Sequence, residues 1–172
     1  MQLPFNNLHL VSALPQRTGL TIRCPASGQV HPLDHSQSPA AAAGFYGLGV
    51  TLQLQGNQLL APFDGLWHQQ DQAGQQLSLQ HQNGLRLLLQ FPPVCAQHHG
   101  LGFDWQVPAR CQVKTGQLLL NFDCALMTQW CKPLLLTMTL PQHDKFNRIS
   151  CRPVYHQAGA DILFFIDVKT AA

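Results

Sequence analysis

Short apolar runs separated by Gly and Pro dominate this chain, and they predict a fold built mostly from strands. The runs are three to five residues long, which is a strand length, and several alternate apolar with polar positions. They lie at residues 50–54, 76–80, 87–89, 118–120, 134–136 and 162–166. Paired Gly and Asn at 55–58 and 82–85 predict tight turns, because both residues tolerate a positive φ. The helical candidate is a short segment at 125–130.

One sequence pattern, small-Pro-x-x-Gly-x-x-His, occurs at 24–31 and again at 61–68. Two partial versions, at 113–119 and 156–163, each place a Gly just before an expected strand. Repeated units of this kind favour an all-β sandwich or barrel. The sequence therefore predicts a duplicated strand-turn unit.

Length and charge narrow the class of protein. The 172 residues suffice for a single core, and we expect one β domain over residues 19–172. Residues 1–18 have no clean hydrophobic period, which predicts a flexible N-terminal arm. Charged residues make up only 10% of the chain, the net charge is +2, and Lys and Arg are not clustered. We therefore expect no nucleic-acid partner.

The N-terminus lacks the basic start and continuous apolar core of a secretory signal. No apolar run approaches the roughly 18 residues that a membrane helix needs, so we expect no integral membrane segment. The six cysteines contain no C-x-x-C pair, which indicates free thiols. These features predict a cytoplasmic protein.

An ordered set of Pro, Gly, Asp and Phe residues runs from residue 22 to residue 140 at nearly constant spacing. It comprises Pro25-Ala26-Ser27-Gly28, Gly47-x-Gly49, Gly56-Asn57, Ala61-Pro62-x-Asp64-Gly65, Ser78, Gly84, Phe91, Gly100-x-Gly102-Phe103, Val113-Lys114-x-Gly116 and Phe122-Asp123. In these positions the chain resembles the IIA component (EIIA) of the glucose-type phosphotransferase system. Members of that family relay a phosphoryl group from the histidine phosphocarrier protein to a sugar permease domain. The resemblance implies an antiparallel β-sandwich of the duplicated hybrid motif type.

The resemblance also implies a degenerate catalytic site. Family members use two histidines on neighbouring strands, one that carries the phosphoryl group and one that holds it, and those positions fall on Gln90 and Gln75 here. An amide nitrogen has delocalised its lone pair and cannot act as the nucleophile, although two such amides on adjacent strands can bond to each other. The binding face implied around them comprises Ser78, Leu88, Val94, Ala96, Gln97 and Tyr46.

Other departures from the family lie beside these two positions. Ser38, Val94 and Gln97 stand where the family has acidic residues, and Pro92-Pro93 follows Phe91 where the family has Gly. The apolar run at 40–46 allows two interpretations, a docking patch or a flexible loop.

Three functions therefore stay open. The first is a non-catalytic EIIA-like paralogue that binds or regulates a protein partner in sugar uptake. The second is an active phosphocarrier that uses a displaced histidine, such as His81. The third is a binding protein for a small ligand, a sugar or a sugar phosphate.

The remaining histidines do not predict a metal site or a cofactor. His31 and His68 occupy equivalent places in the repeat without a Cys or carboxylate at ligand spacing, so we expect them on strand surfaces. His98 and His99 are adjacent, and we expect them in a solvated loop.

Overall fold

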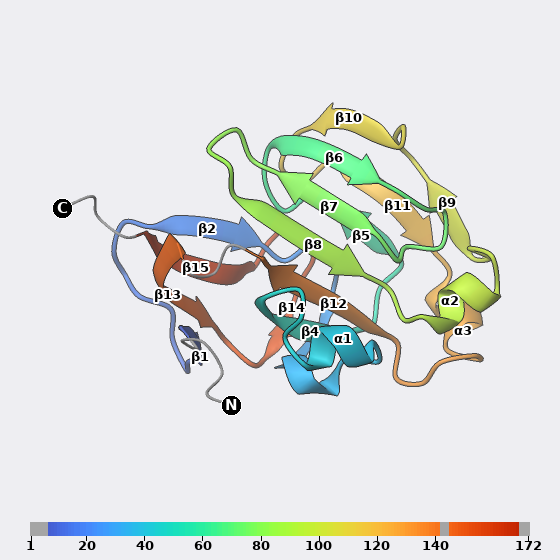
Figure 1. The fold of residues 1–172 in the computed structure, drawn as a ribbon, viewed down its shortest axis with the longest axis horizontal. Coiled ribbons are helices and arrows are strands. Elements are labelled where there is room, and N and C mark those ends of the chain that lie inside the picture. Colours follow the sequence, from blue (N-terminus) through green and yellow to red (C-terminus); the bar gives the residue numbers. More distant parts are fainter. Residues whose placement is uncertain (1–6, 142–144, 169–172) are drawn as a thin grey trace.

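The computed structural model describes residues 7–141 and 145–168, and within them the chain is mostly antiparallel β-sheet (Figure 1). The largest sheet has eight strands in the order β10-β6-β7-β8-β12-β4-β3-β14. Its strands are β3 (Gly28–Pro32), β4 (Leu48–Leu54), β6 (Gly65–Gln69), β7 (Leu77–Gln80), β8 (Arg86–Gln90), β10 (Arg110–Val113), β12 (Leu135–Leu140) and β14 (Tyr155–His156). The predicted all-β class is confirmed, and so is the turn at 82–85, where the amide of Gly84 donates to the carbonyl oxygen of His81 at 2.9 Å. Residues 55–57 instead form a bend that leads from β4 into another sheet, and Gly56 does not adopt the positive φ expected of a tight turn.

Two smaller sheets complete the architecture. The four-stranded sheet has the order β1-β13-β15-β2, and the three-stranded sheet has the order β5-β11-β9. Their strands are β1 (Leu8–Leu10), β2 (Leu20–Arg23), β5 (Gln58–Leu60), β9 (Phe103–Trp105), β11 (Leu118–Phe122), β13 (Phe146–Cys151) and β15 (Ile162–Val168). In Figure 1 the three-stranded sheet lies behind β6, β7 and β8.

Apolar side chains fill the space between the sheets. Trp67 of β6 is fully buried and its ring lies 6.3 Å from that of Trp105 on β9, centroid to centroid. Phe91, also fully buried, meets Phe122 of β11 edge to face at 5.5 Å. These aromatic contacts join the large sheet to the three-stranded one, and they hold β8 and its neighbours in place.

The repeated sequence pattern is visible as a repeated hydrogen-bond pattern. The amide of Gly116 donates to the carbonyl oxygen of Ala61 at 2.8 Å, and the amide of Gly159 donates to that of Cys24 at 2.8 Å. Cys24 and Ala61 hold equivalent places in the two copies, and each copy leads into a strand, β3 or β6. The predicted duplication is therefore present in the backbone.

Residues before β2 contain structure that the sequence did not predict. Leu8–Leu10 forms β1, which pairs in parallel with β13, and Arg17 forms an ion pair with Asp167 of β15. The first part of the predicted arm, residues 1–6, lies outside the described residues. The flexibility of the arm and its boundary at residue 18 stay predictions.

Helical segments are short and lie between strands. The predicted helix at 125–130 is observed as α3 (Cys124–Met127) followed by a turn, and Asp123 caps it by accepting a hydrogen bond from the amide of Leu126 at 3.0 Å. The prediction of one helical segment was incomplete. The described residues also contain η1 (Leu33–His35), α1 (Pro39–Ala42) and α2 (Val94–Gln97).

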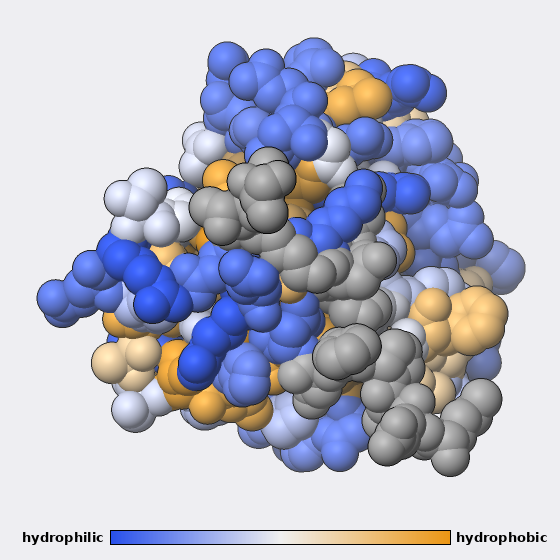
Figure 2. All heavy atoms as spheres, turned by 60° about the vertical axis from the view of Figure 1, so that its left-hand side comes forward, coloured by the Kyte–Doolittle hydropathy of each residue, from blue (hydrophilic) through white to orange (hydrophobic). Residues whose placement is uncertain are grey.

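The surface is hydrophilic although the chain has few charges. Figure 2 shows a face covered mostly by hydrophilic residues, with apolar groups scattered among them. Of the 172 residues, 22 are Gln and none is Glu. Amides therefore supply much of the polarity that carboxylates supply in other domains.

All six cysteines are free thiols, as predicted, and they differ in their surroundings. Cys24, Cys95 and Cys151 are buried, and burial raises the pKa of each to about 12 because the thiolate loses hydration. The other three thiols, Cys111, Cys124 and Cys131, are half-buried.

We expect thiol labelling at pH 8 to separate these two groups. A raised pKa keeps the thiol protonated at this pH, and the three buried thiols are also shielded from reagent. Intact mass after labelling the folded protein should show no more than three adducts, and labelling in denaturant should show six. Rapid modification of Cys24 in the folded protein would contradict this assignment.

Candidate functional site

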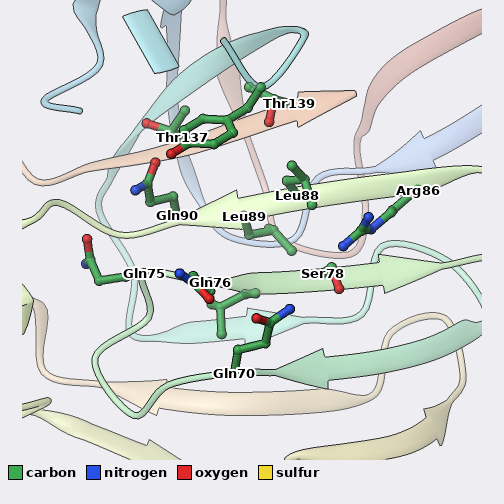
Figure 3. A pocket seen from close by; sticks show the side chains of 12 residues that line it. Gln70, Gln75, Gln76, Ser78, Arg86, Leu88, Leu89, Gln90, Thr137 and Thr139 are labelled. Atoms are coloured by element: carbon green, nitrogen blue, oxygen red, sulfur yellow. The ribbon is translucent and has the colours of Figure 1, made fainter. Parts of the chain in front are cut away.

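A shallow pocket of about 250 Å³ lies on one face of three adjacent strands, β7, β8 and β12 (Figure 3). Alternate residues of β8, namely Arg86, Leu88 and Gln90, line it because successive side chains of a strand point to opposite faces. Strand pairing sets the neighbours: Leu88 stands opposite Ser78 of β7 on one side and opposite Thr139 of β12 on the other.

Some of the predicted site residues line this pocket and others do not. Those that line it are Gln75, Gln90, Ser78, Leu88 and Tyr46. These residues come from the loop before β7, from β7 and β8 themselves, and from the turn before β4. The structure thus brings together five of the residues that the resemblance implied for the site.

The three predicted face residues of α2 lie outside this pocket. Ala96 is exposed and lines an adjoining hollow that also includes Gln75. Val94 is half-buried and Gln97 is exposed, and neither lines the pocket or that hollow.

Gln75 uses its amide on the backbone rather than on Gln90. Its Nε2 donates to the carbonyl oxygens of Phe91 at 3.0 Å and Pro92 at 2.9 Å. In the described part of the chain no hydrogen bond joins the Gln75 and Gln90 side chains, so the suggested amide pair is not formed. Gln75 instead holds the segment that leaves β8.

Asp71, which the sequence reasoning missed, organises the loop that carries Gln75. Its Oδ1 accepts hydrogen bonds from the amides of Ala73 at 2.8 Å and Gln75 at 2.9 Å, and its Oδ2 accepts one from the amide of Gln76 at 2.6 Å. Gly74, at φ +73°, completes the turn. An Asp followed by Gly just before a strand is a signal for such a turn.

We expect Asp71→Asn to loosen this loop. The substitution replaces one acceptor oxygen by an NH₂ group that faces the amide of Gln76, so at least one hydrogen bond is lost, at a cost of about 1 kcal/mol. Hydrogen exchange at the amides of Gln75 and Gln76 should accelerate. Asp104→Asn is the matched control, since Asp104 is exposed on β9. Unchanged exchange at both amides would show that Asp71 does not hold the loop.

The run at 40–46 reaches the pocket at Tyr46, which is its one residue in the lining. Ser38 caps α1 by accepting a hydrogen bond from the amide of Ala41 at 3.5 Å. After the helix, Phe45 is 81% exposed and packs edge to face on Tyr46, with ring centroids 5.7 Å apart. An exposed aromatic pair therefore stands beside the pocket.

His81 lies at the other end of β7 from Gln75. Gln76 and the four residues of β7 lie between the two, and β7 alone corresponds to roughly 13 Å of extended chain. His81 lines a separate, wider groove with Asp64 and Lys114, and its Nδ1 accepts a hydrogen bond from the amide of Asn83 at 3.1 Å. The structure does not bring His81 into the pocket.

Four further histidines, His31, His68, His98 and His99, lie outside the pocket lining. The expectation of a solvated loop was wrong for His98, which is half-buried and stacks on Trp130 at 3.9 Å between ring centroids. Figure 1 shows the reason, because α2 and α3 lie side by side there. His99 is exposed, and His31 and His68 are half-buried on strands β3 and β6.

Within residues 7–141 and 145–168, no group of three or more His, Cys, Asp or Glu side chains is placed to hold a metal ion. Among the same residues, no helix is long and apolar enough to cross a membrane.

The sheet order, the repeat and the pocket define a β-sandwich domain of the EIIA type. The family model described as phosphoenolpyruvate-dependent sugar phosphotransferase system, EIIA 1, matches residues 20–146, and the chain belongs to this family. Its fold is similar to that of glucose permease IIA from Mycoplasma capricolum, with a TM-score of 0.74 over 89% of this chain and 99% of that chain, at 15% identity. This similarity confirms the predicted fold class.

Relatives at the sequence level include an EIIA component and longer proteins. The chain is 30% identical over 128 residues to the glucose-specific EIIBCA component of Corynebacterium glutamicum, covering 74% of this chain and 19% of that protein. It is 30% identical over 156 residues to a lactose permease of Lactobacillus delbrueckii subsp. bulgaricus, covering 90% of this chain and 25% of that protein. It is 23% identical over 130 residues to the glucose-specific EIIA component of Borreliella burgdorferi, covering 76% and 69%. The chain thus spans about a fifth of the EIIBCA relative.

Proposed function

We propose that this EIIA-family domain binds a protein of the sugar phosphotransferase system without carrying a phosphoryl group itself. The composition of the pocket lining is the main support for this proposal. The pocket on β7, β8 and β12 is lined by amide, hydroxyl, aliphatic and guanidinium groups, and none of its lining residues is a histidine. The domain therefore keeps a shaped face but offers no phosphoryl acceptor on it.

The chemistry of the lining explains why transfer should fail. Phosphoryl transfer depends mostly on positioning and electrostatics, but a nucleophile must still lie in line with the phosphorus. Gln75 and Gln90 stand where the resemblance expects histidines, and a carboxamide nitrogen has no lone pair to offer. The hydroxyls of Ser78, Thr137 and Thr139 have no histidine or carboxylate beside them in the lining to act as a base.

A displaced acceptor at His81 has less support. His81 lies at the far end of β7 from Gln75 and Gln90, so a partner that presents its phosphoryl group at those two positions would hold it far from that imidazole.

The residues around the pocket favour docking through apolar and neutral polar contacts. Phe45 and Tyr46 stand on one side of it, and exposed Ala96 and Gln97 of α2 on another. Aromatic anchors surrounded by small and polar residues are typical of protein interfaces. The partner we propose is a phosphotransferase-system protein with a complementary apolar patch, and the setting we propose is the cytoplasm.

A binding titration tests this proposal with a matched pair of variants. We expect the phosphocarrier protein or an isolated sugar-permease IIB domain to shift the NMR signals of Leu88 and Ala96. Ala96→Glu places a charge on the exposed face of α2 and should weaken binding at least tenfold. Val154→Glu, at a 41% exposed position before β14, should leave binding unchanged. Absence of binding to both partners, or equal weakening by both variants, would overturn the proposal.

A further inference from the structure

Arg86 is a cation without a counter-charge in the pocket. It is half-buried at the start of β8 and lines the pocket, and no hydrogen bond or ion pair of its side chain occurs within the described residues. No carboxylate is among the lining residues. Arginine keeps its positive charge at physiological pH, and its planar group suits the oxygen atoms of a phosphate.

The pocket has two chemically different ends. Figure 3 shows Arg86 and Ser78 at one end and Gln75 and Gln90 at the other. Arg86 and Gln90 lie four residues apart on β8, which corresponds to roughly 13 Å along a strand, and the arginine side chain shortens this separation. The Gln90 end adds the hydroxyl of Thr137, which stands directly opposite Gln90 in the sheet. One end therefore attracts an anion, and the other offers neutral hydrogen-bonding groups.

We infer that this pocket binds a phosphorylated monosaccharide, with its phosphate at Arg86 and Ser78 and its hydroxyl groups at Gln90 and Thr137. Carboxamides and alcohols both donate and accept hydrogen bonds, which matches sugar hydroxyls, and the half-buried Leu88 offers an apolar floor between the two ends. The volume of about 250 Å³ lies below that of sites for drug-sized ligands and suits a single sugar ring.

This inference rests on the proposed function only because it places the ligand on the same face of the domain as the partner. A ligand in the pocket would lie beneath the surface on which a partner docks, since Tyr46 both lines the pocket and is 38% exposed. Sugar phosphate would then compete with the partner. Sugar phosphates are the products of sugar kinases and of sugar uptake that is coupled to phosphorylation. Partner binding would therefore respond to the concentration of these products.

Calorimetric titration of the full chain at constant ionic strength tests the inference with three probes: glucose 6-phosphate, glucose and inorganic phosphate. We expect glucose 6-phosphate to bind at least tenfold more tightly than either of the others. Arg86→Gln should weaken its binding at least tenfold. Arg110→Gln, which removes an exposed arginine of β10 outside the pocket, should not.

A second variant tests the neutral end. Gln90→Leu should weaken glucose 6-phosphate binding and leave the weak binding of inorganic phosphate unchanged. No saturable binding of any probe overturns the inference, and so does equal weakening by Arg86→Gln and Arg110→Gln, which would indicate general charge attraction. The titration contains no partner protein, so its failure and the failure of the partner titration are separate results.

Discussion

Gly49→Ala is expected to unfold most of the protein. A Cβ atom at residue 49 would lie 1.8 Å from the carbonyl oxygen of Met138 and 2.8 Å from the Cα of Thr139. Both obstacles are backbone of β12, which pairs with β4 in the middle of the eight-stranded sheet. Close-packed interiors do not yield to such an overlap, because the strands can move apart only by breaking their shared hydrogen bonds.

The loss should exceed about 3 kcal/mol of the free energy of unfolding, above the usual cost of overpacking. Gly56→Ala is the matched control, because a Cβ there would meet only the Ser27 side chain at 3.5 Å, an ordinary contact. Urea unfolding followed by tryptophan fluorescence measures both variants. Equal unfolding midpoints would show that the close approach of β4 and β12 is not rigid.

The strands and the repeat could be predicted because their signals are local. An apolar run such as 87–89 between turn residues needs little tertiary information, and the two copies of the Pro-x-x-Gly pattern are visible as letters. The family could be predicted because its anchor residues keep their order and spacing. Some anchors follow from a backbone demand, as at Gly116, where φ is +83°.

Other features depend on contacts between distant residues. The strand Leu8–Leu10 exists because β13, nearly 140 residues later, offers a free edge. The four-residue helices α1 and α2 have too few residues to show a helical period. The bonds of Gln75 to the carbonyls of Phe91 and Pro92 could not be inferred, because a glutamine has several partners within reach. The lack of a partner for the Arg86 side chain could not be predicted either, because it depends on the positions of all its neighbours.

Histidines at positions 75 and 90, to which the resemblance assigns the family's catalytic pair, should create a phosphoryl acceptor. Gln90→His places an imidazole on the face of β8 that lines the pocket, and Gln75→His supplies a second imidazole from the loop before β7. A phosphorylated phosphocarrier protein would then pass its phosphoryl group from one imidazole nitrogen to another, releasing its own histidine as the leaving group. We expect this gain of phosphoryl transfer to be the largest functional change among the variants.

Two controls make this gain interpretable. His81→Ala in the restored variant should keep the phosphoryl group, because His81 lies in a different groove. Gln75→His alone should gain none, because the resemblance assigns the acceptor role to position 90.

Intact-mass spectrometry after incubation with phosphoenolpyruvate, enzyme I and the phosphocarrier protein measures whether the natural chain accepts a phosphoryl group. The natural chain should keep its mass, and the Gln75→His, Gln90→His variant should gain the mass of one phosphoryl group. A phosphoryl group on the natural chain, lost in His81→Ala, would contradict the claim and identify the domain as a working phosphocarrier. Absence of label on both chains would contradict docking to the phosphocarrier protein.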